Sequence, residues 1–384
     1  MKVAVFTDTY APQINGVVTS ILTMEAEFRR MGHEVVVFCP RIKNARQSTP
    51  TVRRFHSVEF PFQREYHLST PWSRQLKSFK DEGFDIIHAQ TPFSLGFTAA
   101  FLAKRHHLPL VHTYHTYFEE YIHYIPLPRP LMSWFAEVES RRFCNQCDVV
   151  IAPSRQMKDR LVNYDIVVPI EVIPTGVSAE AELTPTDVSR FRVQLGLTNG
   201  HRLLVFAGRL GLEKNVFFLL DSFRTVRRAI GDVKLVIIGD GPQRAAMEEK
   251  VRRLDLEKDV VFTGYLPHRE VLLAFKAATL CVFPSVTETQ GLTVLESMAM
   301  GTPVVGIDAM GVGELLHNNV GGFATDGTLD GFSHATIRLL EDLSLLDQKQ
   351  AEAALRAQTE YSAQALSQKL RTVYETAIRK KKAS

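Results

Sequence analysis

The sequence predicts an α/β protein with two doubly wound domains, each a mostly parallel sheet covered by helices on both faces. Short runs of apolar, often β-branched residues alternate with stretches of helical spacing, as they do in βαβ units. This alternation stops near residue 174 and restarts near residue 201. A chain of 384 residues is also too long for one ordinary hydrophobic core.

Five segments of the N-terminal half are predicted to be buried strands, because each is short and rich in β-branched residues. They are Lys2–Phe6, Val35–Phe38, Asp85–His88, Leu110–Thr113 and Val149–Ala152. Between them, Val17–Arg30 and Ser94–Arg105 have the spacing of amphipathic helices. We therefore assign residues 1–173 to a first domain.

A change of pattern marks the end of that domain. Residues 174–200 hold several prolines and glycines and little strand character, which predicts a linker. After it, the expected strands are Leu203–Ala207, Lys234–Ile238, Val260–Phe262, Leu280–Phe283 and Val304–Gly306, and the expected helices are Val216–Ala229, Gln243–Leu254, Arg269–Ala277 and Leu292–Met300. These define a second domain over residues 201–362, and a last helix, about residues 363–384, is expected to pack back on the first domain.

The composition is that of a soluble globular protein, with 45% hydrophobic and 23% charged residues. No run approaches the ~18 apolar residues that a membrane span needs, and the first residues resemble a strand, so we expect a cytoplasmic protein. The net charge of +3 gives no indication of a nucleic-acid partner. Cys144 and Cys147 have CxxC spacing without a second pair of ligands nearby, which favours buried structural thiols for these and for Cys39 and Cys281.

The segment from Phe283 to Glu296 is the densest in polar residues at a predicted strand end. A strand ends there, a polar loop follows, and a helix begins near Gly291. Backbone N–H groups at such a helix start suit a diphosphate or another anion. Glu288 precedes the helix and Glu296 lies within it, so both carboxylates can face a ligand. Taken alone, the pair is more typical of an acid near a helix start and a second, solvated acid than of a ligand site.

A second loop, at the start of the C-terminal half, carries two cations. Arg209 and Lys214 follow the strand Leu203–Ala207 and lie five residues apart. A guanidinium fork and a lysine point charge together suit a diphosphate leaving group. Gly239 and Gly241 follow the next strand, but a single glycine pair is weak evidence because tight turns need glycine anyway.

In combination these motifs resemble those of the family 4 retaining glycosyltransferases, which have the GT-B fold of two Rossmann-like domains with an interdomain cleft. Glu288 and Glu296 match the E-x7-E signature, and the loop that holds Arg209 and Lys214 matches the donor-phosphate loop. The segments Phe6–Pro12 and Ile14–Val18, the second of which holds Gly16, are similar to the first glycine loop of the family. The resemblance covers nearly the whole chain.

This resemblance implies roles for individual residues. Arg209 and Lys214 would bind the diphosphate and stabilise its departure, and Glu296 would hold the nucleotide ribose. The transferred sugar would be held by Glu288 and the residues after it, Thr289, Gln290, Gly291 and Leu292. The base would lie near Gly239 and Leu266, and Gly16 would approach the donor phosphates or the acceptor. No cofactor and no catalytic metal are expected, because the cations and the helix start take the place of a metal.

A histidine-rich stretch follows the strand Leu110–Thr113. Its members His112, His115 and His123 do not have the spacing of a zinc-binding helix. The resemblance places His115 beside the reacting sugar, as a catalytic or substrate-positioning residue. We expect a structural role for His112, and the roles of His123 and Tyr124 stay open.

The same stretch, residues 112–124, resembles the branch of the family that glucosylates diacylglycerol. The resemblance implies a UDP-sugar donor, a lipid acceptor and attachment to the inner face of the cell membrane. Residues 41–80 hold nine basic residues against two acidic ones, which would suit an anionic membrane surface. Phe62, Trp72, Trp134 and Phe135 are the expected apolar anchors. The alternative is that Trp134 and Phe135 pack in the core while the basic run is a solvated face.

Other functions compete with this interpretation. Related enzymes transfer mannose from GDP-mannose or galactose from UDP-galactose, or use a soluble acceptor. A sugar-nucleotide epimerase would need no acceptor, and the combination of Arg209, Lys214, Glu288 and Glu296 argues against it. A non-catalytic nucleotide-binding protein would have no need for both charge pairs together with His115.

Overall fold

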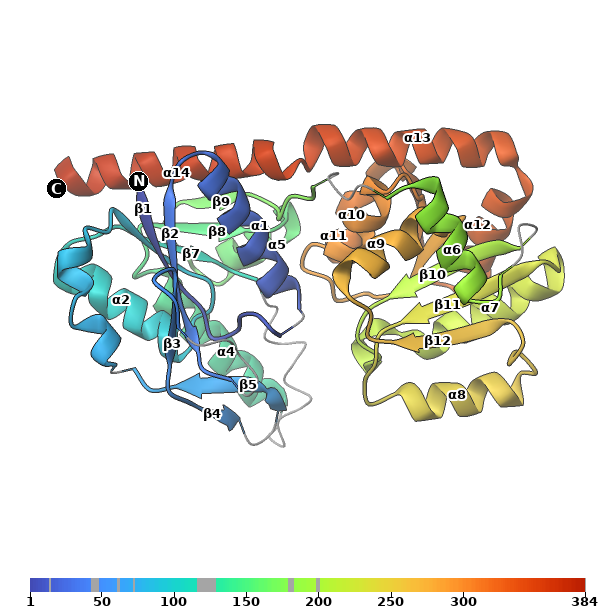
Figure 1. Ribbon diagram of the computed structural model, residues 1–384, viewed down its shortest axis with the longest axis horizontal. Coiled ribbons are helices and arrows are strands. Elements are labelled where there is room, and N and C mark those ends of the chain that lie inside the picture. Colours follow the sequence, from blue (N-terminus) through green and yellow to red (C-terminus); the bar gives the residue numbers. More distant parts are fainter. Residues whose placement is uncertain are drawn as a thin grey trace. The chain divides into compact units, whose positions relative to one another are not determined.

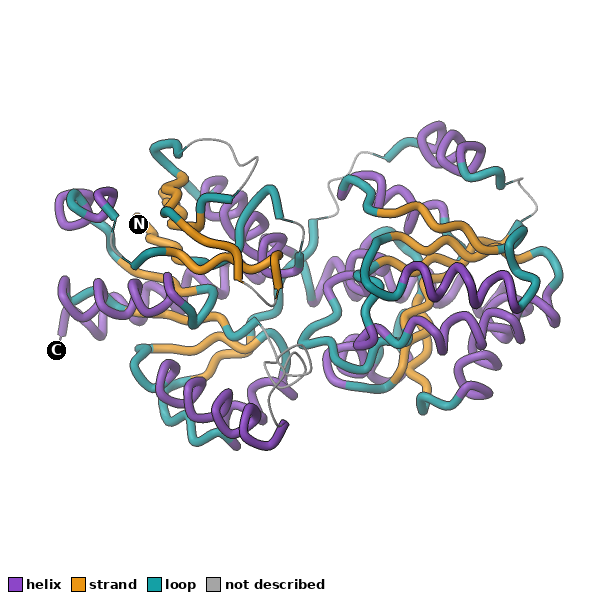
Figure 2. Tube along the Cα trace, turned by 90° about the horizontal axis from the view of Figure 1, so that it is seen from below, coloured by secondary structure: helices purple, strands orange, loops and turns teal. Residues whose placement is uncertain are grey.

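The computed structural model describes residues 1–13, 15–42, 48–60, 63–71, 73–115, 129–178, 183–197 and 201–383. The chain divides into two compact units: Met1–Gly176 with Ala363–Ser384 form the first, and Val177–Ser362 form the second. Each unit has its own parallel sheet (Figure 1), and Figure 2 shows helices on both sides of the strands in each. This confirms the predicted fold class of two Rossmann-like domains.

The first unit contains a seven-stranded parallel sheet in the order β3-β2-β1-β6-β7-β8-β9. Its strands are β1 (Lys2–Phe6), β2 (Glu34–Pro40), β3 (Val52–Phe55), β6 (Ile86–Ala89), β7 (Leu110–Thr113), β8 (Val149–Ala152) and β9 (Ile170–Val172). The strand order reverses between β1 and β6. Loops that leave two such strands diverge, and the gap between them is where sheets of this type bind ligands.

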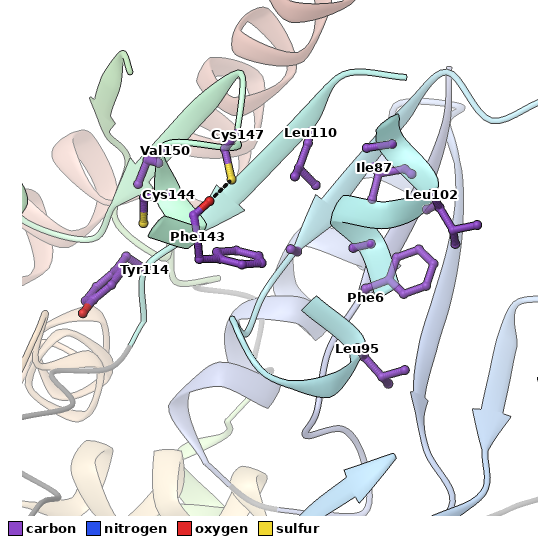
Figure 3. Close-up of a cluster of buried hydrophobic side chains, with 14 of the residues drawn as sticks. Phe6, Ile87, Leu95, Leu102, Leu110, Tyr114, Phe143, Cys144, Cys147 and Val150 are labelled. Carbon is purple, nitrogen blue, oxygen red and sulfur yellow. Dashed lines mark hydrogen bonds between the residues drawn. The ribbon is translucent and has the colours of Figure 1, made fainter. Parts of the chain in front are cut away.

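Helices cover both faces of this sheet. They are α1 (Gly16–Arg30), α2 (Ser94–His106), α4 (Arg129–Cys144), α5 (Arg155–Asn163) and α14 (Ala363–Ala383), with short 3₁₀ turns η1 (Arg74–Leu76) and η2 (Phe79–Glu82). On one face, Leu95 and Leu102 of α2 and Phe143 of α4 join Phe6 in a buried cluster (Figure 3). On the other, Tyr374 of α14 packs against Phe28 of α1, with ring centroids 5.3 Å apart.

An antiparallel hairpin, β4 (Ser57–Phe60) and β5 (Gln63–Ser69), lies outside the main sheet of the first unit. The sequence analysis did not predict it, because its strands are rich in polar and charged residues. This hairpin falls within the basic segment 41–80, so part of that segment is regular structure.

The second unit contains a six-stranded parallel sheet in the order β12-β11-β10-β13-β14-β15. Its strands are β10 (Arg202–Ala207), β11 (Val233–Ile238), β12 (Val260–Gly264), β13 (Leu280–Phe283), β14 (Val304–Ile307) and β15 (Gly322–Thr325). Its helices are α6 (Pro185–Gln194), η4 (Leu212–Lys214), α7 (Val216–Ile230), α8 (Arg244–Arg253), α9 (His268–Ala277), α10 (Leu292–Ala299), α11 (Met310–Leu315), η5 (His317–Asn319), α12 (Leu329–Glu341) and α13 (Leu343–Glu360). The order reverses between β10 and β13.

The expected linker over residues 174–200 contains a helix, α6, that belongs to the second unit. The sequence analysis treated Pro185 as a breaker, but proline at the first helical position is favourable. Thr184 accepts a hydrogen bond from the Asp187 backbone, and the Asp187 carboxylate accepts one from the Thr184 backbone, which forms a capping box. Arg269 of α9 also contacts Asp187, 3.3 Å away.

The four cysteines are buried and unbridged, as the sequence analysis predicted. Burial raises the pKa of the Cys144 thiol to about 12 and that of Cys147 well above its usual value, which makes both thiols unreactive. Within the part of the chain that the structure describes, no helix combines the length and apolarity needed to span a bilayer.

Candidate active site

The second unit brings its charged candidates together where the strand order reverses. Arg209 and Lys214 lie on the loop after β10, and Glu288 lies on the loop after the neighbouring strand β13. The two strands run parallel, so both loops leave the same edge of the sheet. Two segments more than 70 residues apart in the sequence therefore meet at one place.

Lys214 and Glu288 form an ion pair across these two loops. Both side chains are largely shielded, with 16% and 17% of their surface exposed. The hydroxyl of Ser285 donates a second hydrogen bond to the same carboxylate oxygen, over 2.7 Å. The lysine charge is thus balanced by a neighbouring carboxylate. Arg209 lies half-buried on the same loop as Lys214.

The glycines after β11 let its loop pack against the Arg209 loop. The Leu210 N–H donates to Asp240 O over 2.9 Å, and the Gly208 N–H donates to Ile238 O over 2.9 Å. A Cβ at Gly239, which has a φ of +126°, would lie 2.0 Å from Gly208 O. A Cβ at Gly241 would lie 2.6 Å from Leu210 O. The sequence analysis rated this glycine pair as weak evidence, yet it supports the backbone that carries Arg209.

The start of α10 is held from the other side by helix α11, which follows β14. Gly291, with a φ of +83°, caps the helix, and Leu292 is its first residue. The Gly311 N–H donates to Glu288 O over 2.9 Å, and a Cβ at Gly311 would lie 2.5 Å from the Cα of Gln290. The backbone of residues 288–291, which includes Thr289, is therefore fixed by close packing. Its N–H groups lie at a positive helix end that favours an anion.

Glu296 lies on α10 and is paired with a residue that the sequence analysis did not single out. The imidazole of His268, at the start of α9, lies 2.8 Å from the Glu296 carboxylate. This hydrogen bond raises the pKa of His268. Close by in sequence, the Tyr265 hydroxyl donates to Asp240 O over 3.3 Å, so the Tyr265–Pro267 segment that holds Leu266 meets the Gly239–Gly241 turn.

In the first unit, His115 follows β7 at the corresponding edge of the sheet. Its Nε2 lies 2.5 Å from Oε1 of Gln90, which follows β6. Burial, together with the neighbouring His112, lowers the pKa of His115 to about 3, so the imidazole is neutral near pH 7. His112 donates from Nδ1 to Ala89 O over 2.8 Å within the apolar cluster, as expected for a structural histidine. Gly16 is the exposed first residue of α1, directly after the cap Asn15.

Of the residues expected to contact a membrane, some are exposed and others are buried or paired. Trp134 and Phe135 of α4 are 61% and 52% exposed, so they do not pack in the core. Arg54 is buried, however: it donates to Ala11 O over 2.8 Å and to Pro40 O over 3.2 Å, which excludes it from a lipid-facing surface. Arg53 pairs with Glu82 at 3.3 Å.

Four residues singled out in the sequence, Phe62, Trp72, His123 and Tyr124, lie outside the residues that the structure describes. Over the described ranges, no group of three or more His, Cys, Asp or Glu side chains is placed to hold a metal ion.

The sequence analysis missed three polar residues at these edges: Ser285, His268 and Gln90. Gln90 and Ser285 each come within two residues of a strand's carboxyl end. The rule that ligands bind at such ends could therefore have drawn attention to both. His268 carries no comparable signal, because its partner Glu296 lies 28 residues further along the chain.

Two family models match the chain: Glycosyltransferase Family 4 over residues 14–181 and Glycosyl transferases group 1 over residues 187–357. The chain is 37% identical to an alpha-monoglucosyldiacylglycerol synthase of Streptococcus pneumoniae, over 79% of this chain and 70% of that protein. The protein of the same name from Acholeplasma laidlawii is 26% identical, over 79% and 80%. A GDP-mannose-dependent alpha-mannosyltransferase of Corynebacterium glutamicum is 28% identical, over 85% and 77%.

Solved structures with the same fold include sucrose-phosphate synthase of Thermosynechococcus elongatus, with a TM-score of 0.79 and 19% identity over 98% of each chain. Anabaena HepE, solved with UDP and glucose, gives a TM-score of 0.77 and 20% identity over 98% of this chain and all of the other. At these identities the likeness establishes the fold alone.

Proposed function

The chain belongs to the family 4 glycosyltransferases, and we propose that it transfers glucose from UDP-glucose to diacylglycerol with retention of the anomeric configuration. The observation that carries this proposal is the set of charges at the carboxyl edge of the second sheet. Lys214, Glu288 and Glu296 come from three different elements there, next to the backbone N–H groups at the start of α10. Such a site offers cations to a diphosphate and carboxylates to sugar and ribose hydroxyls.

In this proposal the Lys214–Glu288 ion pair breaks when the donor binds, and each side chain takes a new partner on the donor. Lys214 and Arg209 take the diphosphate, and Glu288 accepts from hydroxyls of the transferred sugar. The acceptor oxygen then bonds to the anomeric carbon on the face from which the diphosphate leaves, as the bond from this carbon to the phosphate oxygen breaks. The leaving phosphate takes up the proton of the acceptor hydroxyl, and the product is α-linked. These steps need no bound metal, since the cations and the helix start stabilise the departing charge.

The donor and the acceptor are proposed from the relatives. The two alpha-monoglucosyldiacylglycerol synthases favour glucose and diacylglycerol by name. The similarity to a GDP-mannose-dependent alpha-mannosyltransferase makes GDP-mannose the second candidate donor. The identity of the nucleotide and of the transferred sugar is therefore the most specific claim of the proposal and the first to test.

We place the protein at the inner face of the cell membrane through its first unit. Phe97 and Phe101 of α2 are exposed, as are Trp134 and Phe135 of α4. Phe97 contacts Phe143 of α4, with ring centroids 5.6 Å apart, which joins the two helices. These aromatic side chains suit a membrane interface. Within residues 41–80, Arg41, Lys77 and Lys80 are exposed and would face anionic lipid.

A screen of donors against lipid vesicles tests this function. The protein is incubated with UDP-glucose, UDP-galactose or GDP-mannose and with diacylglycerol in anionic vesicles, and the products are identified by mass spectrometry and proton NMR. We expect an α-glucosyl diacylglycerol from UDP-glucose. A mannosylated lipid would show that GDP-mannose is the donor instead. A β-linked product would contradict retention, and a product found only in the soluble fraction would contradict a lipid acceptor. Conversion of UDP-glucose to UDP-galactose in the absence of lipid would instead indicate a sugar-nucleotide epimerase.

A further inference from the structure

A chain of buried polar groups connects His115 to the C-terminal helix of the first unit. Gln90 contacts His115 on one side and His88 on the other. The Nδ1 of His88 bonds the hydroxyl of Tyr374 on α14, and its Nε2 bonds the Thr113 hydroxyl over 2.7 Å. His88, Gln90 and Tyr374 have at most 3% of their surface exposed. Such groups are costly to bury unless their hydrogen bonds are satisfied, so each one constrains the next.

The position of Gln90 over His88 fixes which way its amide points. The Gln90 nitrogen lies 3.1 Å from Nδ1 and 3.3 Å from Nε2 of His88. An atom nearly equidistant from both ring nitrogens cannot lie along either in-plane lone pair, so it lies over the face of the ring. An N–H group is favourable above an aromatic face, whereas a carbonyl oxygen is not. The oxygen of the Gln90 amide is therefore the atom that faces His115.

An amide oxygen can only accept a hydrogen bond, and this determines the tautomer of His115. Because burial keeps the pKa of His115 near 3, the imidazole carries a single proton at neutral pH. That proton must be on Nε2 to be donated to Gln90 Oε1. The lone pair of the ring is then on Nδ1, which can accept a hydrogen bond but cannot donate one.

We propose that Gln90 is a positioning residue for glycosyl transfer: it holds His115 as the Nε2–H tautomer, so that Nδ1 accepts a hydrogen bond from a substrate hydroxyl. Tyr374 supports this arrangement by fixing His88 beneath the Gln90 amide. The role in transfer rests on the proposed function, whereas the tautomer follows from the contacts of the first unit alone. The last helix of the chain thereby contributes to the chemistry of the N-terminal half.

The test replaces Gln90 with Met, which has a similar length but no strong acceptor. Gln146→Leu, at an exposed position on the surface of the same unit, is the matched control. The kcat and the KM for UDP-glucose are measured with diacylglycerol vesicles, and the His115 tautomer is read from long-range proton–nitrogen NMR spectra. We expect Q90M to lower kcat about tenfold or more, to leave the KM for UDP-glucose within about twofold, and to mix the His115 tautomers. The control keeps both parameters and the tautomer.

Unchanged kcat in Q90M, or a reduced kcat with His115 still wholly Nε2–H, would overturn the proposal. If Q90M does not fold, Tyr374→Phe takes its place, because it removes only the hydroxyl that fixes His88. It is expected to mix the His115 tautomers and to lower kcat by a smaller factor, and an unchanged tautomer would overturn the proposal. The NMR measurement needs no activity, so it separates a failure of this inference from a failure of the proposed function.

Discussion

The two sheets share one topology but surround their carboxyl edges with different electrostatics. In the second unit, Lys214 pairs with Glu288 and His268 with Glu296, in groups that solvent still reaches. In the first unit, burial lowers the pKa values of His88 and His115, which favours the neutral form of both. One edge thus carries an ion pair, whereas the other carries neutral histidines. The difference teaches that a shared fold does not assign shared chemistry, because the side chains at the strand ends decide it.

The proposed function assigns different tasks to these two edges. A diphosphate needs cations and helix N–H groups, which the second unit offers through Lys214 and α10. Sugar and acceptor hydroxyls need an oriented hydrogen-bonding group without competing charge, and we propose His115, held in place by Gln90, for this task. Each prediction below changes one edge and leaves the other intact.

The largest effect is expected at the charged edge. Changing Arg209 or Lys214 to Ala should lower turnover by about 100-fold or more, because each change removes a preorganised contact to the leaving group. The rate of transfer from UDP-glucose measures this, and Arg228→Ala on the exposed side of α7 is the control. Near-normal turnover in both variants would contradict the assignment of this loop to diphosphate binding.

The next effect concerns the backbone that supports Arg209. Gly239→Ala adds a Cβ 2.0 Å from Gly208 O at a φ of +126°, so the Arg209 loop must move. Gly231→Ala is the control, because its φ of +81° is also positive but nothing lies within 4 Å of the new Cβ. We expect G231A to cost about 1 kcal/mol of unfolding free energy, and G239A to cost more and also to raise the KM for UDP-glucose. Equal effects of the two substitutions on both quantities would count against the role of close packing.

A third prediction tests whether the membrane contact belongs to the first unit. Changing Trp134 and Phe135 together to Ala removes two exposed aromatic side chains, each of which stabilises a membrane contact by up to about 2 kcal/mol. Vesicle sedimentation should show at least tenfold weaker binding, and binding of the parent should fall as salt rises. The control changes Leu343 and Leu355, which are equally exposed on α13 of the second unit. Equal loss in both double variants would contradict the assignment.

The smallest effect is expected at the His268–Glu296 pair. Because the folded pKa of His268 is raised, the pair stabilises the fold fully below the ordinary histidine pKa, and this contribution is lost as pH rises through the raised value. His268→Gln should therefore cost more unfolding free energy near pH 5.5 than near pH 8.5, by less than about 1 kcal/mol because the imidazole is 60% exposed. Urea unfolding of this variant and of the exposed control His334→Gln at both pH values measures the difference. A larger cost near pH 8.5 would contradict the pairing.

How much the sequence could predict depends on how local each feature is. The strands β1, β7, β8 and β13 were predicted with their observed bounds, because short apolar runs between turn residues are local signals. The charged edge was predictable for the same reason, since Arg209, Lys214 and Glu288 each lie in a segment that connects a predicted strand to the next predicted helix.

The remaining features depend on distant contacts. His88 and Tyr374 are 286 residues apart, and nothing in the spacing of either indicates that they bond. A count of basic residues treated Arg54 as exposed, although its guanidinium is buried against backbone carbonyls. Helix α6 was missed because Pro185 was taken as the end of regular structure rather than as the start of a helix.

Binding of UDP alone tests the division between the two edges most directly. Calorimetry compares Arg209→Ala and Lys214→Ala with His115→Ala and Gln90→Met, using a ligand that has the nucleotide and its diphosphate but lacks the transferred hexose. Loss of one charge-assisted contact costs about 1.5–3 kcal/mol, which is about 10- to 150-fold in Kd. We therefore predict at least tenfold weaker binding for the two variants of the charged edge and a change within about twofold for the two variants of the neutral edge. Equal weakening in all four, or weakening confined to His115→Ala and Gln90→Met, would contradict the account.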